Sequence, residues 1–246
     1  MDVAVGQGAG IICFQEIFNL HWFPKDRDEK AFALAEEVTG ESVRVIRERS
    51  RAAGVVVLLP MFEKDGDRYY NSCHVIDGGE VAGVYRKVHI PDIPLWEEQY
   101  YFSPGSADFP VFETRHGTIG IQISWDNLYP EGTRVLALKG ADIIFAPTAC
   151  AFKSQHIWQT VLSANAIANG VYVMRVNRVG PEDAQDFYGK SFVVNAEGEL
   201  TGGPTGTGDS VLLAETDFDY LKRIRREWPM RRWRRPSLYG EITREG

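Results

Sequence analysis

The sequence predicts an α/β protein whose sheets are not purely parallel. Short, fully apolar runs alternate with longer helical stretches, which is typical of strands buried between layers of helices. Two pairs of strand-like runs flank the turns Asp77-Gly78-Gly79 and Glu197-Gly198, and each pair predicts an antiparallel hairpin. The chain has 246 residues, 44% hydrophobic and 25% charged, which allows a substantial core and argues against a disordered or fibrous protein.

The predicted elements follow from these local patterns in chain order. Apolar runs predict strands, and Gly54 and Gly170 are expected to end two of the helices. The expected strands cover residues 11–14, 55–60, 68–76, 80–88, 120–124, 141–147, 171–176, 190–195, 200–202 and 212–217. The expected helices cover residues 29–38, 41–53, 131–139 and 154–169. Because no repeat and no long linker divides the chain, we expect one domain over residues 1–246.

Charge and composition restrict the expected partners and compartment. The 27 basic and 34 acidic residues leave a net charge of −7, which is atypical of a general nucleic-acid-binding protein. A basic, aromatic tail at residues 222–246 is interpreted as a solvated or interface segment rather than as a nucleic-acid or membrane contact. No apolar run approaches the roughly 20 residues that span a bilayer, and residues 1–10 do not resemble a signal peptide. Three cysteines without paired spacing predict reduced thiols in a cytoplasmic protein, without a disulfide framework or zinc site.

Three chemically useful side chains lie where apolar strands are expected to end. Glu16 follows residues 11–15, Lys87 follows residues 84–86, and Ser124 follows residues 119–123. Strand ends are positions at which rigid scaffolds present functional groups. A carboxylate base, an ammonium that stabilises an oxyanion and a nucleophile suffice for acyl transfer. Taken singly, Glu16 and Lys87 are better explained as solvated side chains, and Ser124 could be a loop-initiating hydroxyl.

The strings around these residues resemble the nitrilase superfamily of carbon–nitrogen hydrolases, over about residues 10 to 240. The strings are Cys13-Phe14-Gln15-Glu16, Tyr85-Arg86-Lys87-Val88-His89-Ile90-Pro91 and Ser124-Trp125-Asp126. The chain is most similar to the N-carbamoylputrescine amidase and β-ureidopropionase branches. The resemblance implies a four-layer α-β-β-α sandwich that hydrolyses an amide or N-carbamoyl C–N bond with no metal or organic cofactor. It also implies that copies pair into a homodimer or a larger homo-oligomer.

The resemblance implies a Glu-Lys-Cys site. Glu16 matches the general base, Lys87 the oxyanion-stabilising lysine, and Glu98 a second glutamate that holds the lysine. The nucleophilic cysteine falls on Ser124, and a hydroxyl needs a stronger base than a thiol, so this chain is expected to be poorly active or inactive. Two explanations stay open, an inactivating substitution or a natural residue in a weak hydrolase, and the otherwise complete site favours substitution or recent loss. The alternative function is a catalytically silent binding or regulatory homologue that keeps the pocket.

Substrate contacts are expected from residues in or after the same motifs. Trp125, His21 and Asn177 are the candidates for binding a small amide or carbamoyl substrate. A further set follows Pro147, where core packing or surface exposure is the competing interpretation: Phe152, Lys153, Gln155, His156 and Trp158.

The resemblance also implies a departure at the N-terminus. Family members usually begin with a strand and a helix before the strand that carries the glutamate, whereas here Met1 lies close before that strand. We therefore expect a sandwich that lacks the first strand and most of the first helix and exposes a sheet edge.

Overall fold

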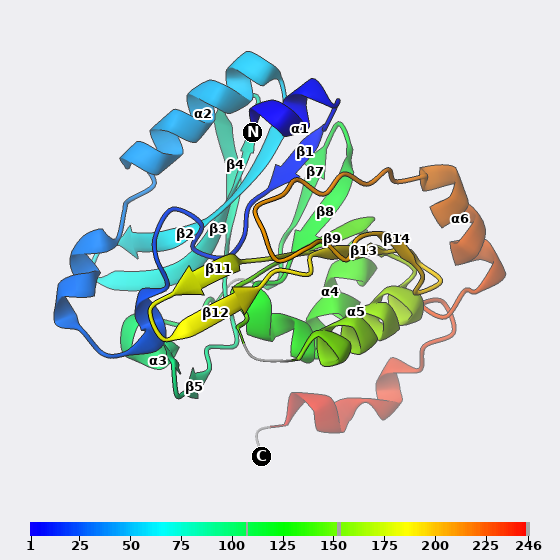
Figure 1. Ribbon diagram of the computed structural model, residues 1–246. Helices are drawn as coiled ribbons and strands as arrows, with labels where there is room; N and C mark the ends of the chain where they lie inside the picture. Colours follow the sequence, from blue (N-terminus) through cyan, green and yellow to red (C-terminus); the bar gives the residue numbers. More distant parts are fainter. Residues whose placement is uncertain (107, 152–153, 245–246) are drawn as a thin grey trace.

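Two mixed β-sheets face each other in the computed structural model, which describes residues 1–106, 108–151 and 154–244 (Figure 1). The first sheet has the order β1-β2-β3-β4. β1 (Ile11–Cys13) is parallel to β2 (Val56–Asp65), and β3 (Arg68–Asp77) and β4 (Glu80–Arg86) continue it as antiparallel strands. The helices α1 (Asp2–Gly6) and α2 (Glu41–Ala53) cover its outer face.

The second sheet has the order β14-β13-β10-β9-β8-β7. Its parallel centre is β8 (Gly117–Ile121), β9 (Ile143–Thr148) and β10 (Tyr172–Asn177). Antiparallel strands flank this centre: β7 (Val111–Thr114), β13 (Phe192–Val194) and β14 (Leu200–Gly202). The helices α4 (Pro130–Leu138) and α5 (Gln155–Asn169) pack on its outer face.

The remaining elements are short and connect or extend these layers. Two small hairpins pair β5 (Asp92–Ile93) with β6 (Trp96–Glu97) and β11 (Val179–Glu182) with β12 (Gln185–Tyr188). The helix α3 (Glu98–Tyr101) follows β6, and α6 (Phe218–Glu227) begins the basic tail. The 3-10 helices are Phe23–Lys25, Glu29–Leu34, Ser124–Leu128, Pro236–Leu238 and Gly240–Thr243.

The apolar run in β2 shows why the layers form. Val56 and Leu58 pack between the two sheets, and Val57 and Leu59 pack toward α2. Successive strand residues point to opposite faces, so a strand covered on both faces is apolar at every position. On the far side, Leu136 of α4 and other helical residues pack on the second sheet. The architecture is therefore the expected α-β-β-α sandwich.

Most predicted elements are confirmed, including two helix ends. Gly54 after α2 and Gly170 after α5 adopt left-handed φ angles of 64° and 59°, which cost glycine no steric penalty. Two predictions are wrong. Residues 212–217 alternate as a strand would, but within the described residues no strand pairs with them. The expected helix at 29–38 is only the 3-10 helix Glu29–Leu34, because the chain then extends to bridge Glu36 to Glu63 of β2.

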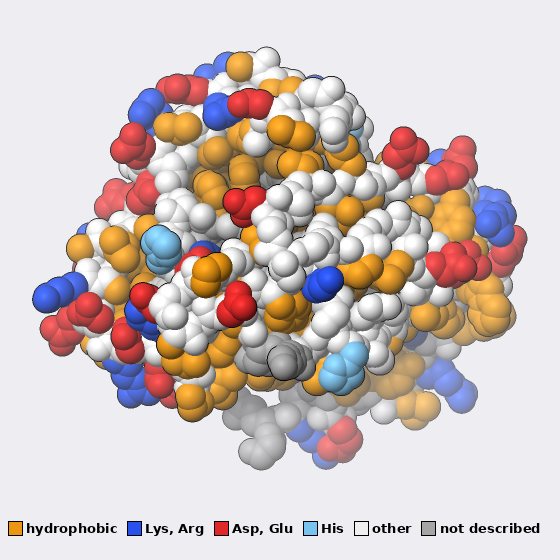
Figure 2. All heavy atoms as spheres, viewed as in Figure 1, with side chains coloured by type: hydrophobic (Ala, Val, Ile, Leu, Met, Phe, Trp, Pro, Cys, Tyr) orange, Lys and Arg blue, Asp and Glu red, His pale blue; other side chains and the backbone are white. Residues whose placement is uncertain are grey.

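A groove follows the edge of β1 that does not pair with β2. It has a volume of about 810 Å³ and is bordered by α1, β1 and residues 210–216. Figure 2 shows apolar side chains gathered in this groove below α1. Among the described helices, none is both long enough and apolar enough to cross a membrane.

Candidate active site

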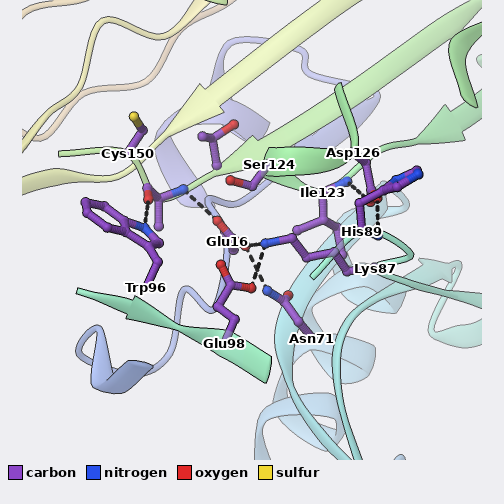
Figure 3. Close-up of polar contacts among 12 residues, drawn as sticks. Glu16, Asn71, Lys87, His89, Trp96, Glu98, Ile123, Ser124, Asp126 and Cys150 are labelled. Atoms are coloured by element: carbon purple, nitrogen blue, oxygen red, sulfur yellow. Dashed lines mark hydrogen bonds and ion pairs between the residues drawn. The ribbon is translucent and has the colours of Figure 1, made fainter. Parts of the chain in front are cut away.

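Glu16 lies at the centre of a buried polar cluster between the two sheets (Figure 3). Its Oε1 accepts hydrogen bonds from Asn71 Nδ2 at 2.7 Å and from Lys87 Nζ at 3.0 Å. Its Oε2 accepts a hydrogen bond from the backbone N–H of Ala149 at 2.7 Å. These donors come from β3, from the end of β4 and from the end of β9, so both sheets fix one carboxylate.

Lys87 lies between two carboxylates. Besides its contact with Glu16, its Nζ donates a hydrogen bond to Glu98 Oε2 at 2.7 Å, and the lysine side chain is fully buried. Burial by itself lowers the pKa of Lys87, but the charges of Glu16 and Glu98 outweigh burial and raise it. Lys87 is therefore an ammonium throughout the neutral range and can stabilise a developing oxyanion.

Glu98, at the start of α3, has a different protonation behaviour. Burial raises the pKa of Glu98 from 4.5 to about 7, although Lys87 acts in the opposite direction, and Glu16 adds to the rise. The pair of carboxylates around one ammonium therefore changes its total charge near neutral pH.

Ser124 is the first residue of the 3-10 helix Ser124–Leu128 and has a positive φ of 48°. Asp126 stabilises this turn, because its Oδ2 accepts from Ile123 N at 3.1 Å and its Oδ1 accepts from His89 N at 2.9 Å. The same carboxylate thus joins the Ser124 turn to the segment that follows Lys87. Figure 3 shows Ser124 beside Glu16.

A small cavity, here called the central hollow, lies next to this cluster. Its volume is about 10 Å³, which is room for about one water molecule. It is lined by Pro91, Ile93, Trp96, Glu98, Ser124, Trp125, Ala149, Cys150 and Trp158. Cys150 is a second nucleophilic side chain there, but Figure 3 shows its sulfur pointing away from Glu16.

The three predicted substrate-binding residues lie in different surroundings. Trp125 lines the central hollow. His21 does not, because its side chain is 91% exposed and lies 3.7 Å from Glu182. Asn177 is buried and forms hydrogen bonds with the backbone of two segments. Its Oδ1 accepts from Cys150 N, and its Nδ2 donates to the carbonyls of Cys150 and Gly189. His21 therefore lies at the surface, and Asn177 positions the backbone beside Cys150. A substrate contact for either residue stays a prediction.

Of the further candidates after Pro147, Trp158 lines the hollow and His156 is exposed. Gln155 lies behind the hollow, beside Arg175. Phe152 and Lys153 lie outside the described residues.

Sequence reasoning missed the residues that position Glu16 and its neighbours. Asn71 gave no signal, because an asparagine within a strand is unremarkable until its partner is known. Trp96 donates from Nε1 to the carbonyl of Ala149 at 3.0 Å, which fixes the peptide segment that binds Glu16. Asp126 lies in one of the three strings, but its contact with His89 is tertiary, as is the contact of Arg178 with Glu16.

The assembled groups are a buried carboxylate, a buried ammonium and a hydroxyl beside one cavity. Such a set can accept a proton, stabilise an oxyanion and attack a carbonyl carbon. Within the described ranges, no group of three His, Cys, Asp or Glu side chains is placed to hold a metal ion.

Comparisons with known proteins agree with this chemistry. Residues 1–226 match the family described as Carbon-nitrogen hydrolase. A citrullinase of Francisella tularensis is 38% identical over 255 residues, covering 98% of this chain and 89% of that protein. An N-carbamoylputrescine amidase of Solanum lycopersicum is 37% identical over 250 residues, covering 95% and 83%. A crystal structure of a carbon–nitrogen hydrolase from Helicobacter pylori G27 superposes with a TM-score of 0.94 at 33% identity, covering 99% of this chain and 90% of that one.

Proposed function

Because the chain belongs to the carbon–nitrogen hydrolase family, we propose that its site is built to hydrolyse an N-carbamoyl amine or a related linear amide. The family assignment makes it an amidohydrolase of amide and ureido compounds. The observation that carries the site assignment is Lys87 Nζ, placed 3.0 Å from Glu16 and 2.7 Å from Glu98 beside the hollow that Ser124 lines.

In the proposed mechanism, residue 124 attacks the carbonyl carbon of the amide or ureido group. Glu16 accepts the proton of the nucleophile, and Lys87 with the backbone N–H of Trp125 stabilises the oxyanion. The tetrahedral intermediate collapses, its C–N bond breaks, and ammonia or an amine leaves after taking up a proton. Water, deprotonated by Glu16, then hydrolyses the acyl-enzyme.

Ser124 makes this reaction slow in the chain as it stands. A thiol reaches its thiolate with a modest pKa shift, whereas a serine hydroxyl requires a far stronger base than a carboxylate. The same residue supports the second candidate function, a silent binding or regulatory homologue that keeps the hollow but does not turn over its ligand.

Three further proposals accompany this function. Residues 1–246 form one domain, and the protein works in the cytoplasm. Copies also pair as a homodimer or larger homo-oligomer, which is supported by apolar side chains exposed on α4 and α5: Leu138, Ile157 and Ile167.

The test is a panel of carbamoyl amines, carbamoyl amino acids, amides and nitriles, offered to Ser124→Cys and to the parent chain. Hydrolysis by the cysteine variant and very slow turnover by the parent would support the hydrolase. A folded Ser124→Cys protein that binds panel members yet stays inert would support the silent binder instead.

A further inference from the structure

Arg175 is a fully buried cation, and no carboxylate among the described residues balances its charge. It lies on β10 with no exposed surface, and no ion pair joins it to an acidic residue in the described part of the chain. Its Nη2 donates to Tyr188 Oη at 2.9 Å and its Nη1 to Gln155 Oε1 at 3.3 Å. The guanidinium otherwise faces aromatic rings, with its centre 4.9 Å from that of Trp158. A buried guanidinium without a counter-charge is costly.

Two buried donors in this cluster also lack an acceptor. Arg175 Nε and Gln155 Nε2 are both inaccessible to solvent, and neither has a hydrogen-bond partner among the described residues. Both orphan groups are donors, so the missing partner is an acceptor. An anion with two oxygen atoms would accept hydrogen bonds from both donors and balance the charge of Arg175.

The N-terminus of α5 lies at the same place. Gln155 is the first residue of this 15-residue helix, whose first-turn N–H groups and dipole favour negative charge. Ser154 precedes it and has its Oγ 3.3 Å from Cys150 Sγ. Two neighbours of this cluster, Cys150 and Trp158, also line the central hollow with Ser124.

We infer that Arg175, Gln155 and the first turn of α5 form a carboxylate-binding subsite behind the central hollow. This inference rests on the proposed function and narrows its substrate to ureido or amide acids rather than ureido amines. A substrate carboxylate reaches Arg175 when Trp158 or Cys150 moves aside. An ammonium group at the same position would face an unbalanced buried cation and be rejected.

The test compares three ligands that differ only at one end: 4-ureidobutyrate, butylurea and N-carbamoylputrescine, which are anionic, neutral and cationic. Calorimetry on the chain with Ser124 needs no turnover. We expect 4-ureidobutyrate to bind at least about tenfold more tightly than butylurea, and N-carbamoylputrescine to bind most weakly. Arg175→Gln should lower the affinity for 4-ureidobutyrate to that for butylurea and leave the butylurea affinity unchanged. Gln155→Ala should reduce the ratio of the two affinities several-fold.

Controls separate a binding role from a structural one. Arg44→Gln, on the exposed face of α2, should leave all three affinities unchanged. Thermal unfolding establishes whether each variant folds. If Arg175→Gln does not fold, Arg175→Lys replaces it, and this variant, which keeps the charge, should retain part of the higher affinity for 4-ureidobutyrate. Equal affinities for the three ligands, or an advantage that survives Arg175→Gln, would overturn the subsite.

Butyrate distinguishes failure of the subsite from failure of the proposed function. Suppose that butyrate binds as tightly as 4-ureidobutyrate and that Arg175→Gln removes this binding. The subsite then stands, and the ureido substrate class is wrong. If neither butyrate nor 4-ureidobutyrate binds, the subsite itself is wrong.

Discussion

Arg178 binds the backbone of Glu16 from 162 residues away in the sequence. Its Nη2 donates to the carbonyl of Glu16 at 3.0 Å and to that of Ile17 at 2.5 Å, and its Nη1 donates to the carbonyl of Leu20 at 3.0 Å. Ile17 has a φ of 47°, which is a costly conformation for a β-branched residue. The arginine thus stabilises a strained turn directly after the proposed general base.

Replacing this arginine should therefore destabilise the protein and misplace Glu16. We expect Arg178→Lys to lower the free energy of unfolding by roughly 3 kcal/mol, because the shorter ammonium side chain cannot reach these three carbonyls together. Urea unfolding measures this loss. Arg44→Lys, at an exposed pair on α2, is the control and should change stability by less than about 0.5 kcal/mol. Equal stabilities for the two variants would contradict this role of Arg178.

Ser124→Cys should raise hydrolysis of amide or ureido substrates by several orders of magnitude. The exchange supplies a thiol that Glu16 can deprotonate, and the groups that bind substrate are unchanged. Turnover should therefore rise while ligand affinity changes little, since the gain is made in the transition state. Steady-state kinetics and calorimetry measure the two quantities, with Ser124→Ala as the inactive reference. A folded cysteine variant no faster than that reference would count against the hydrolase.

Glu98→Gln, made in the Ser124→Cys protein, should lower turnover and leave the fold intact. Glu98 Oε2 lies 2.7 Å from Lys87 Nζ, so the amide loses a charged contact that orients the ammonium. We expect a decrease of about 10- to 100-fold in kcat, from the loss of one charge-assisted contact. Glu97→Gln is the matched control, because this neighbouring carboxylate pairs with Arg27 at the surface. Undiminished turnover in the Glu98 variant would show that Glu98 is dispensable.

Glu98 should also make stability depend on pH. The pKa of Glu98 is about 7 in the folded protein, against an ordinary value of 4.5, so the folded state holds an extra proton between these values. Its contribution to stability is therefore fully present below about pH 4.5 and is lost as the pH rises through about 7. The shift corresponds to roughly 3 kcal/mol. Urea midpoints at pH 5 and pH 8 should thus differ less in Glu98→Gln than in the parent, and identical differences would refute this protonation behaviour.

The sequence predicted those parts of the fold that depend on the pattern of neighbouring residues, such as buried strands and helix ends. The run at 55–60 is a strand because both of its faces are buried, and Gly170 ends α5 because the left-handed conformation suits glycine. Residues 212–217 alternate as a strand would but lack a pairing strand in the described chain, and no local pattern shows whether a partner is present. The strings that contain Glu16 and Lys87, together with the family match at Glu98, located three side chains that are in direct contact. Asn71 and Arg175 could not be found this way, because their surroundings are created only by tertiary packing.

The backbone at Ser124 limits which side chains can serve as a nucleophile there. A φ of 48° is a costly conformation for a β-branched residue, so threonine is a poor substitute although it carries the same hydroxyl group. Cysteine and serine are unbranched and differ by a single atom, so either fits the turn that Asp126 holds. An exchange between sulfur and oxygen can therefore switch the chemistry at this position while the protein keeps its shape. The shape of the pocket and its reactivity can therefore change independently of each other.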